Sequence, residues 1–177
     1  DGDAAALRLA GPVVVADGAA SLQAGGELSV ASLALAGSNR SAELQAGGRL
    51  VLGGGDGLVT QQGAVLARAG GDLIVGRVDA DSAAVALQAA RLLDADSGDD
   101  AAAAAAADIT AGTLQLRAST AIGAAGQALE LRATTLSAVA GAGGLFITEA
   151  DGLVVGSTAA TVQRVNADAS VTRVDAA

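Results

Sequence analysis

Apolar and polar residues alternate along most of this chain in short stretches. Alternation with a period of two is typical of β-strands that bury one face. A pair of glycines follows several of these stretches, where a tight corner or a close backbone approach is needed. The clearest examples end in Gly25-Gly26, Gly47-Gly48 and Gly70-Gly71. The pattern predicts short strands joined by tight turns.

The alanine that precedes the glycine pair recurs through later, more degenerate copies. Its positions are Ala24, Ala46, Ala69, Ala89, Ala111 and Ala133, which lie 20 to 23 residues apart. A period in the low twenties, carried by strands, is typical of a β-solenoid. We therefore expect residues 1–177 to form a single right-handed parallel β-helix, with a period near 22 residues and about eight coils.

Two other repeat folds fit less well. A leucine-rich repeat has a similar period but needs an asparagine or cysteine ladder, and the chain has only Asn39 and Asn166. A left-handed β-helix requires an aliphatic residue at every sixth position, and no such register holds over two coils. The right-handed form with larger coils is preferred.

Residues 94–107 interrupt the repeat with an acidic loop and a polyalanine run, Ala101 to Ala107. The run fits a helical turn, a strand or a mobile tip. The loop holds the densest group of carboxylates, and oxygen ligands of this kind suit Ca²⁺. The predicted calcium loop is Asp94, Asp96, Asp99 and Asp100; a plain solvated loop is the alternative.

Composition excludes several kinds of active site. The chain has no Lys, His, Cys, Met, Trp or Tyr, and its one aromatic residue is Phe146. Nucleophile systems that need His or Cys are excluded, and no Lys follows a glycine run to form a phosphate loop. Ala, Val, Leu and Ile must fill the interior in thin layers, as in a solenoid.

The net charge of −9 would repel phosphate backbones and anionic membranes. We therefore expect no nucleic-acid partner, and no apolar stretch is long enough to predict membrane insertion. Arg40, Arg49, Arg68, Arg77, Arg91, Arg117 and Arg132 recur near the coil spacing. This spacing suggests either a binding stripe or, preferably, a solvated face with salt bridges to the intervening acids.

Some β-helices process polysaccharides, so an enzyme has to be considered. A glycosidase needs two carboxylates, for which Asp56, Asp96 and Asp99 are candidates. Lyase chemistry needs a base, and Arg is the only basic residue type in the chain. Without Trp or Tyr to line a carbohydrate cleft, we expect no enzyme activity and no cofactor other than the calcium considered above.

Residues 108–156 resemble the repeats of giant bacterial β-strand-repeat surface proteins, and are similar to the filamentous haemagglutinin type of adhesin. The resemblance lies in two Leu-x-Ala steps, the Ile122-Gly123 pair, and the strand Gly143 to Ile147 followed by an acidic turn. It implies export to the cell surface, a long right-handed β-helical shaft, and a role in adhesion, aggregation or matrix structure.

These observations predict the structural shaft of a secreted or surface-displayed bacterial protein, and a fragment of a much longer chain. Expected partners are like chains or neighbouring segments of the same polypeptide, with cell-surface receptors or glycans in addition. A self-assembling extracellular filament or sheath subunit is the alternative, followed by a polysaccharide-processing β-helix.

Overall fold

The computed structural model describes residues 4–95 and 107–176. These residues form parallel β-strands stacked as a solenoid, with a two-stranded antiparallel hairpin lying across them. The strands, in chain order, are β1 Leu7–Val15, β2 Ala20–Ala24, β3 Leu28–Leu35, β4 Ala42–Ala46, β5 Leu50–Thr60, β6 Val65–Ala69, β7 Asp72–Val75, β8 Val78–Asp79, β9 Ala84–Asp94, β10 Ile109–Ile122, β11 Leu129–Val139, β12 Gly144–Leu145, β13 Ile147–Glu149, β14 Val154–Val155, β15 Thr161–Val165 and β16 Val171–Asp175.

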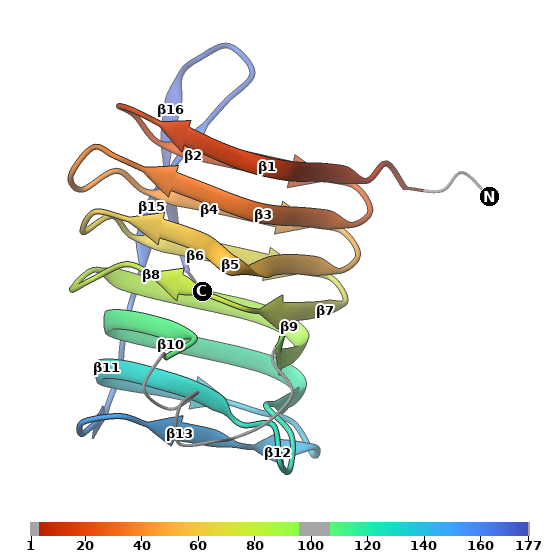
Figure 1. The fold of residues 1–177 in the computed structure, drawn as a ribbon, viewed down its shortest axis with the longest axis vertical. Coiled ribbons are helices and arrows are strands. Elements are labelled where there is room, and N and C mark those ends of the chain that lie inside the picture. The colour runs from red at the N-terminus through yellow and green to blue at the C-terminus, as the bar shows by residue number, and fades with distance from the viewer. Residues whose placement is uncertain (1–3, 96–106, 177) are drawn as a thin grey trace.

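The expected β-solenoid with a period of ~22 residues is confirmed. It has about six turns, fewer than the eight or so coils expected. In Figure 1 the near strands run from right to left, the chain returns behind them, and each coil lies below the last, which makes the coil right-handed. Fewer coils fit because residues 95–108 link two strands of one coil, and the hairpin uses the last part of the chain.

Each coil has three faces, and equivalent residues stack along the axis. The first face is formed by the start of β3 and its equivalents, the second by the end of β3 and its equivalents, and the third by the stack of β2, β4, β6, β9, β10, β11 and β14. Neighbouring strands in such a stack lie about 4.8 Å apart. A side chain therefore meets its own equivalents from the coils above and below.

The core is built from these axial stacks of aliphatic side chains. One stack on the first face is fully buried and consists of Leu28, Leu50, Leu73, Leu92 and Ile122. Phe146, the one aromatic residue, lies outside the stacks in the last coil and is 38% exposed. The expected core of aliphatic residues in thin layers is confirmed for the described residues.

Glycine is required at the corner that follows the third face, because the backbones of successive coils approach closely there. A Cβ atom on Gly47 would lie 2.1 Å from the carbonyl oxygen of Gly25, and one on Gly70 would lie 2.2 Å from that of Gly47. The glycine pairs that mark the repeat in the sequence therefore have a steric cause.

The alanine repeat holds for four coils and then shifts. Ala24, Ala46 and Ala69 stack in register, and β9 continues the stack as far as Ala89. The next residue in the stack is Ala118, not Ala111 as the spacing predicted. Ala111 and Ala133 do pair with each other, but on the second face. The insertion between β9 and β10 shifted the register of the apparent repeat.

The hairpin of β15 and β16 crosses the outside of the third face at a steep angle to the strands (Figure 1). It covers the outward-facing side chains Leu66 and Ala86, which form a second apolar cluster with Ala160 and Val162 of the hairpin segment. Among the described residues there is no helix long and apolar enough to cross a membrane.

Candidate functional site

The ends of the insertion are anchored at the corner between the first and second faces. The amide of Ala95 donates to the carbonyl of Val75 at 2.9 Å, and the amide of Val78 donates to the carbonyl of Asp108 at 2.7 Å. In the preceding coil the same corner consists of Gly76 and Arg77. The insertion therefore leaves and rejoins one coil without breaking the hydrogen bonds on either side.

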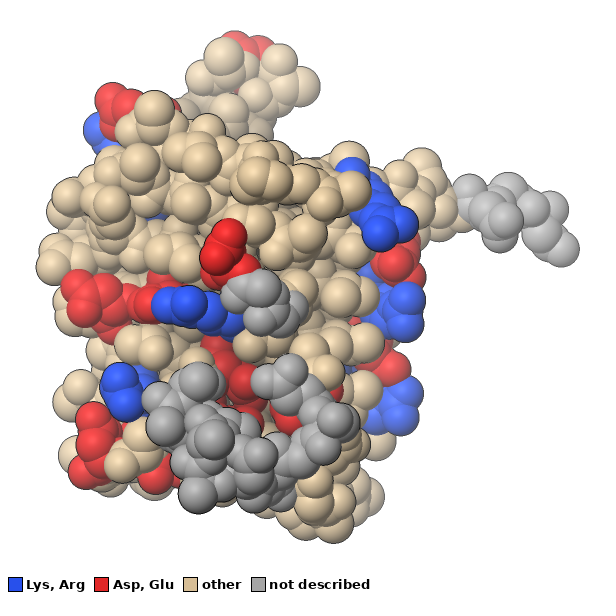
Figure 2. Space-filling model, in the orientation of Figure 1, with Lys and Arg blue, Asp and Glu red and all other residues tan. Residues whose placement is uncertain are grey.

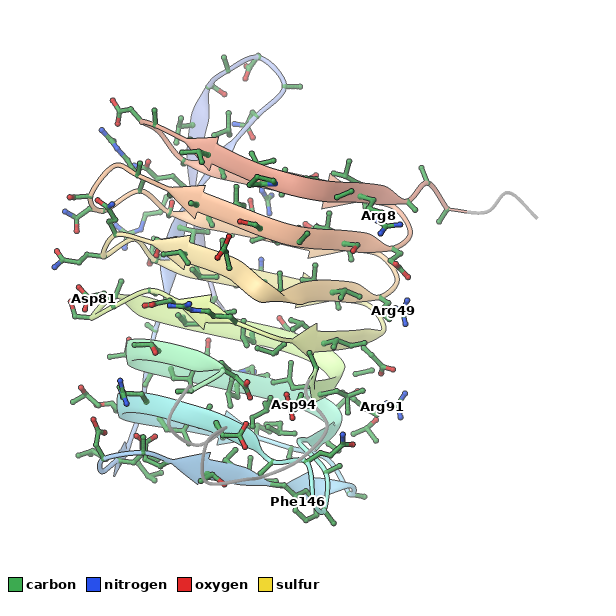
Figure 3. The ribbon with its side chains drawn as sticks, viewed as in Figure 1. Arg8, Arg49, Asp81, Arg91, Asp94 and Phe146 are labelled. Atoms are coloured by element: carbon green, nitrogen blue, oxygen red, sulfur yellow. The ribbon has the colours of Figure 1, made fainter. Side chains whose placement is uncertain are left out.

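Three carboxylates meet where the insertion is anchored. Asp94 ends β9, Asp108 precedes β10, and Glu130 of β11 stacks beneath Asp108 in the next coil, because Ile109 pairs with Leu131. One carboxylate oxygen from each residue lies within 4.8 Å of the other two. Figure 3 labels Asp94 on this side of the molecule. We call these three residues the carboxylate cluster.

The carboxylate cluster is buried as well as crowded. Asp108 and Glu130 are each 3% exposed, and Asp94 is half-buried. The amide of Glu130 donates to Oδ2 of Asp108 at 3.1 Å. Burial raises the pKa of Asp108 to about 8, and the nearby charges of Asp94 and Glu130 act in the same direction. The amide hydrogen bond opposes this shift but does not cancel it.

This geometry suits either a proton or a hard cation. Burying like charges together is unfavourable unless a proton neutralises one group or a positive ion compensates them. Carboxylate oxygens from three separate positions match the ligands of Ca²⁺. With oxygen ligands only, the carboxylate cluster lacks the nitrogen and sulfur ligands favoured by softer transition metals.

The structure describes one of the four residues of the predicted calcium loop. Asp94 belongs to the carboxylate cluster, whereas Asp96, Asp99 and Asp100 lie outside the described residues, as does most of the polyalanine run. Asp108 and Glu130 were not predicted. Asp108 directly follows the polyalanine run, but nothing in the local sequence places Glu130, 22 positions later, beside it.

Comparison with protein-family models, curated proteins and solved structures finds no match for this chain.

The recurring arginines form a largely ion-paired surface, as preferred from the sequence. Four of the seven pair with acids: Arg40 with Asp17, Arg49 with Glu27, Arg77 with Asp79 and Arg91 with Asp72. Arg68 instead donates to the carbonyl of Asp175 and to the side chain of Gln88. The arginine spacing thus has a structural explanation at most of these positions.

Two of these pairs belong to one axial column, which we call the charge column. It consists of Glu27, Arg49, Asp72 and Arg91, whose signs alternate from coil to coil. Figure 2 shows the alternation along the right edge, and Figure 3 labels Arg49 and Arg91 there. The hydrogen bond from Arg91 lowers the pKa of Asp72.

The carboxylates considered for glycoside hydrolysis are not brought together among the described residues. Asp56 is exposed on β5, while Asp96 and Asp99 lie outside the described residues. One groove of about 490 Å³, along the third face, is lined by small, amide and arginine side chains that include Gln45, Arg68 and Gln88. The prediction that the chain is not an enzyme stays a prediction.

Proposed function

We propose that this chain is a segment of the structural shaft of a secreted or cell-surface bacterial protein that acts in adhesion or extracellular matrix formation. The observation that carries the proposal is the uninterrupted axial stacking of the coils. Parallel hydrogen-bond ladders connect every coil from β1 to β13 and β14. A rod of this kind transmits force along its length and holds a binding surface away from its base.

The interactions between coils support a stiff spacer. Fully buried aliphatic stacks run along the axis, and the charge column links coils on the outside. Bending the rod would open one side of these stacks, and protein interiors resist such gaps because they are closely packed. Stiffness therefore arises from the repeat itself and requires no bound ligand.

Localisation and partners are part of the same proposal. A chain without cysteine needs no oxidising step to reach this fold, and a net charge of −9 disfavours nucleic acid. The partners we propose are neighbouring segments of the same polypeptide, with cell-surface receptors or glycans recognised elsewhere on the assembled protein. A self-assembling filament or sheath subunit is the alternative, and a polysaccharide-processing β-helix ranks below it.

The proposal is tested with the native protein from its source. An antibody raised against this chain should label intact cells or the medium, and should detect a polypeptide much larger than 16.7 kDa on a denaturing gel. A native polypeptide near 16.7 kDa would favour the filament subunit. Labelling confined to the cell interior would overturn the proposal. Release of sugar ends from acidic polysaccharides would favour the enzyme.

The adhesive role needs its own measurement. Cells that lack the coding region should adhere or aggregate less than the parent strain, and restoring the gene should reverse the defect. As a matched control, a version in which Asp56 is replaced by Asn should restore adhesion fully if no carboxylate catalysis is involved. Unchanged adhesion after deletion would leave a shaft without an adhesive role.

A further inference from the structure

The two ends of the solenoid carry unpaired strand edges. Among the described residues, β2 pairs only with β4 and β1 only with β3 at one end, and β13 and β14 each pair only with β11 at the other. Exposed valines lie on these outer strands: Val14 is 65% exposed at the first end, and Val154 and Val155 are 62% and 80% exposed at the second. Because all these strands run parallel, the two ends could pair in a head-to-tail stack of copies.

The segment that includes β15 runs back along the rod from the second end toward the first. The hydroxyl of Thr158 donates to the carbonyl of Leu114 at 3.4 Å, near the second end. Farther along, the amide of Gln163 donates to Oγ of Ser41 at 2.7 Å, and that of Val165 to Oγ of Ser21 at 2.9 Å. Ser21 belongs to β2, so Val165 lies level with the outermost strand of this face.

This segment follows one axial row of outward-facing positions on the third face. The row consists of Ser21, Glu43, Leu66, Ala86, Gln115 and Ser137. Arg164 forms a two-pronged ion pair with Glu43, which is 1% exposed. A buried charge that loses its partner is strongly destabilising, so this pair fixes the hairpin in position.

The hairpin does not stop at the last strand. Val165 pairs with Val171, so the turn between them projects past β2, as the blue loop above β1 and β2 in Figure 1 shows. The turn is internally ordered: the amide of Asn166 donates to the carbonyl of Ser170 at 2.9 Å, and the amide of Ser170 donates to Oδ1 of Asp168 at 3.0 Å. An ordered projection of this kind occupies space that the hairpin segment of a second, stacked copy would need.

We propose that the tip of this hairpin, residues 166–170, is a guard that prevents a second copy of the chain from stacking on the first end. In a head-to-tail stack, the last coil of the upper copy would continue the axial row described above. That coil places Gly156 in the row, since its amide donates to the carbonyl of Leu136. The upper copy's own hairpin segment departs from this point, so it would collide with the tip below.

The test is to remove the projection and keep the rest of the hairpin. Deleting residues 165–171 and joining Arg164 to Thr172, which pair in register, through Asn-Gly gives a two-residue hairpin turn. Sedimentation velocity should show the unmodified chain as a monomer and the shortened one as dimers and longer linear assemblies. Such growth is expected from a head-to-tail contact, which does not close on itself.

Three further variants keep the result interpretable. Placing Val154→Arg and Val155→Arg in the shortened chain should restore the monomer if assembly uses the ends. Asn166→Ala with Asp168→Ala retains the full length of the tip but removes the hydrogen bonds that these two side chains make to Ser170, and should assemble to a smaller extent. Ala167→Ser, which keeps the tip intact, should remain monomeric.

Three results would overturn the proposal. The first is a shortened chain that melts cooperatively yet stays monomeric, together with a monomeric Asn166→Ala, Asp168→Ala chain. The second is linear assembly of the unmodified chain. The third is assembly of the shortened chain that the valine replacements leave unchanged, since the contact would then not involve the second end.

Discussion

In two groups of charged residues, axial stacking brings ionisable side chains from successive coils close together, but the signs of the charges are arranged differently. In the charge column, axial stacking places Glu27, Arg49, Asp72 and Arg91 above one another, and their signs alternate. In the carboxylate cluster, stacking places Glu130 beneath Asp108, with Asp94 beside them, and the signs are the same. The first group is solvated on the surface, whereas two members of the second are almost fully buried.

The charge column has a structural role, whereas the carboxylate cluster is a candidate functional site. A repeat with a short axial spacing brings every ionisable residue close to its equivalent, so alternation of sign is the arrangement that avoids repulsion. A site that departs from alternation and is also buried is unfavourable unless a proton or cation is bound there. Departure from alternation is therefore what marks the carboxylate cluster.

The largest expected effect is a loss of stability as the pH rises. Asp108 has a pKa of about 8 when folded, against an ordinary value of 3.8, so the native state holds a proton that the unfolded state releases. The free energy of unfolding should fall between pH 4 and pH 8, at about 1.4 kcal/mol for each unit of pKa shift. Urea unfolding at several pH values measures this slope, and Asp108→Asn should remove most of it.

The matched control lies in the charge column. Because Arg91 lowers the pKa of Asp72, its contribution is present at neutral pH and is lost as the pH falls through the lowered pKa. Asp72→Asn should therefore lower the free energy of unfolding at neutral pH, and its difference from the unmodified chain should disappear on the acid side, with no change in the slope near pH 8. If Asp108→Asn and Asp72→Asn gave the same pH profile, the contrast between the two groups would be wrong.

The next effect in size is expected from calcium. Above pH 8 Asp108 is ionised, and Ca²⁺ bound by the carboxylate cluster should raise the free energy of unfolding by about 2.7 kcal/mol at a hundredfold excess over the dissociation constant. Thermal melts with Ca²⁺ and with chelator would show the shift, and Glu130→Gln should abolish it. A melting temperature that Ca²⁺ leaves unchanged in the unmodified chain would contradict the calcium prediction for Asp94.

A smaller effect should follow from breaking the alternation on the surface. Arg49→Glu would place a third acid between Glu27 and Asp72, with a destabilisation of about 1 kcal/mol or less because these side chains are solvated. High salt should largely abolish this difference. A change of similar size at low and high salt would indicate a packing effect instead of a charge effect.

The smallest effect is expected from Arg91→Ala, at the end of the charge column. The ion pair with Asp72 is lost, but the remaining carboxylate becomes hydrated and no like charge is introduced. The shift in melting temperature should be below that of Arg49→Glu at low salt. A larger loss would show that the arginine stem contributes by packing over the corner.

The regular coils were predictable because packing and steric requirements fix their residues directly. The glycine pairs at Gly47 and Gly70 are imposed by close backbone contacts, and the alternation around them follows from one buried face. These signals located the first four coils in register. They failed at Ala111, because a constant spacing cannot reveal how many residues of an insertion lie outside the coil.

The carboxylate cluster and the crossing hairpin were not predictable from alternation. Glu130 occupies an outward position between Leu129 and Leu131, where an acid is ordinarily solvated, and its burial depends on distant parts of the chain. A weak signal for the hairpin did exist, since Leu66 is an apolar residue at an outward position. Its 1% exposure is explained by the hairpin segment packed over it.

The corner between the first and second faces varies in length from coil to coil. It is Ala31 in the second coil, Gly76 and Arg77 in the fourth, and residues 95–108 in the fifth. The corner between the third and first faces varies less: it consists of Gly70 and Gly71 before Asp72 but of Ala90 alone before Arg91. The corner between the first and second faces therefore tolerates the longest insertion among the described coils, and this variable edge is the natural place to graft a foreign peptide for display.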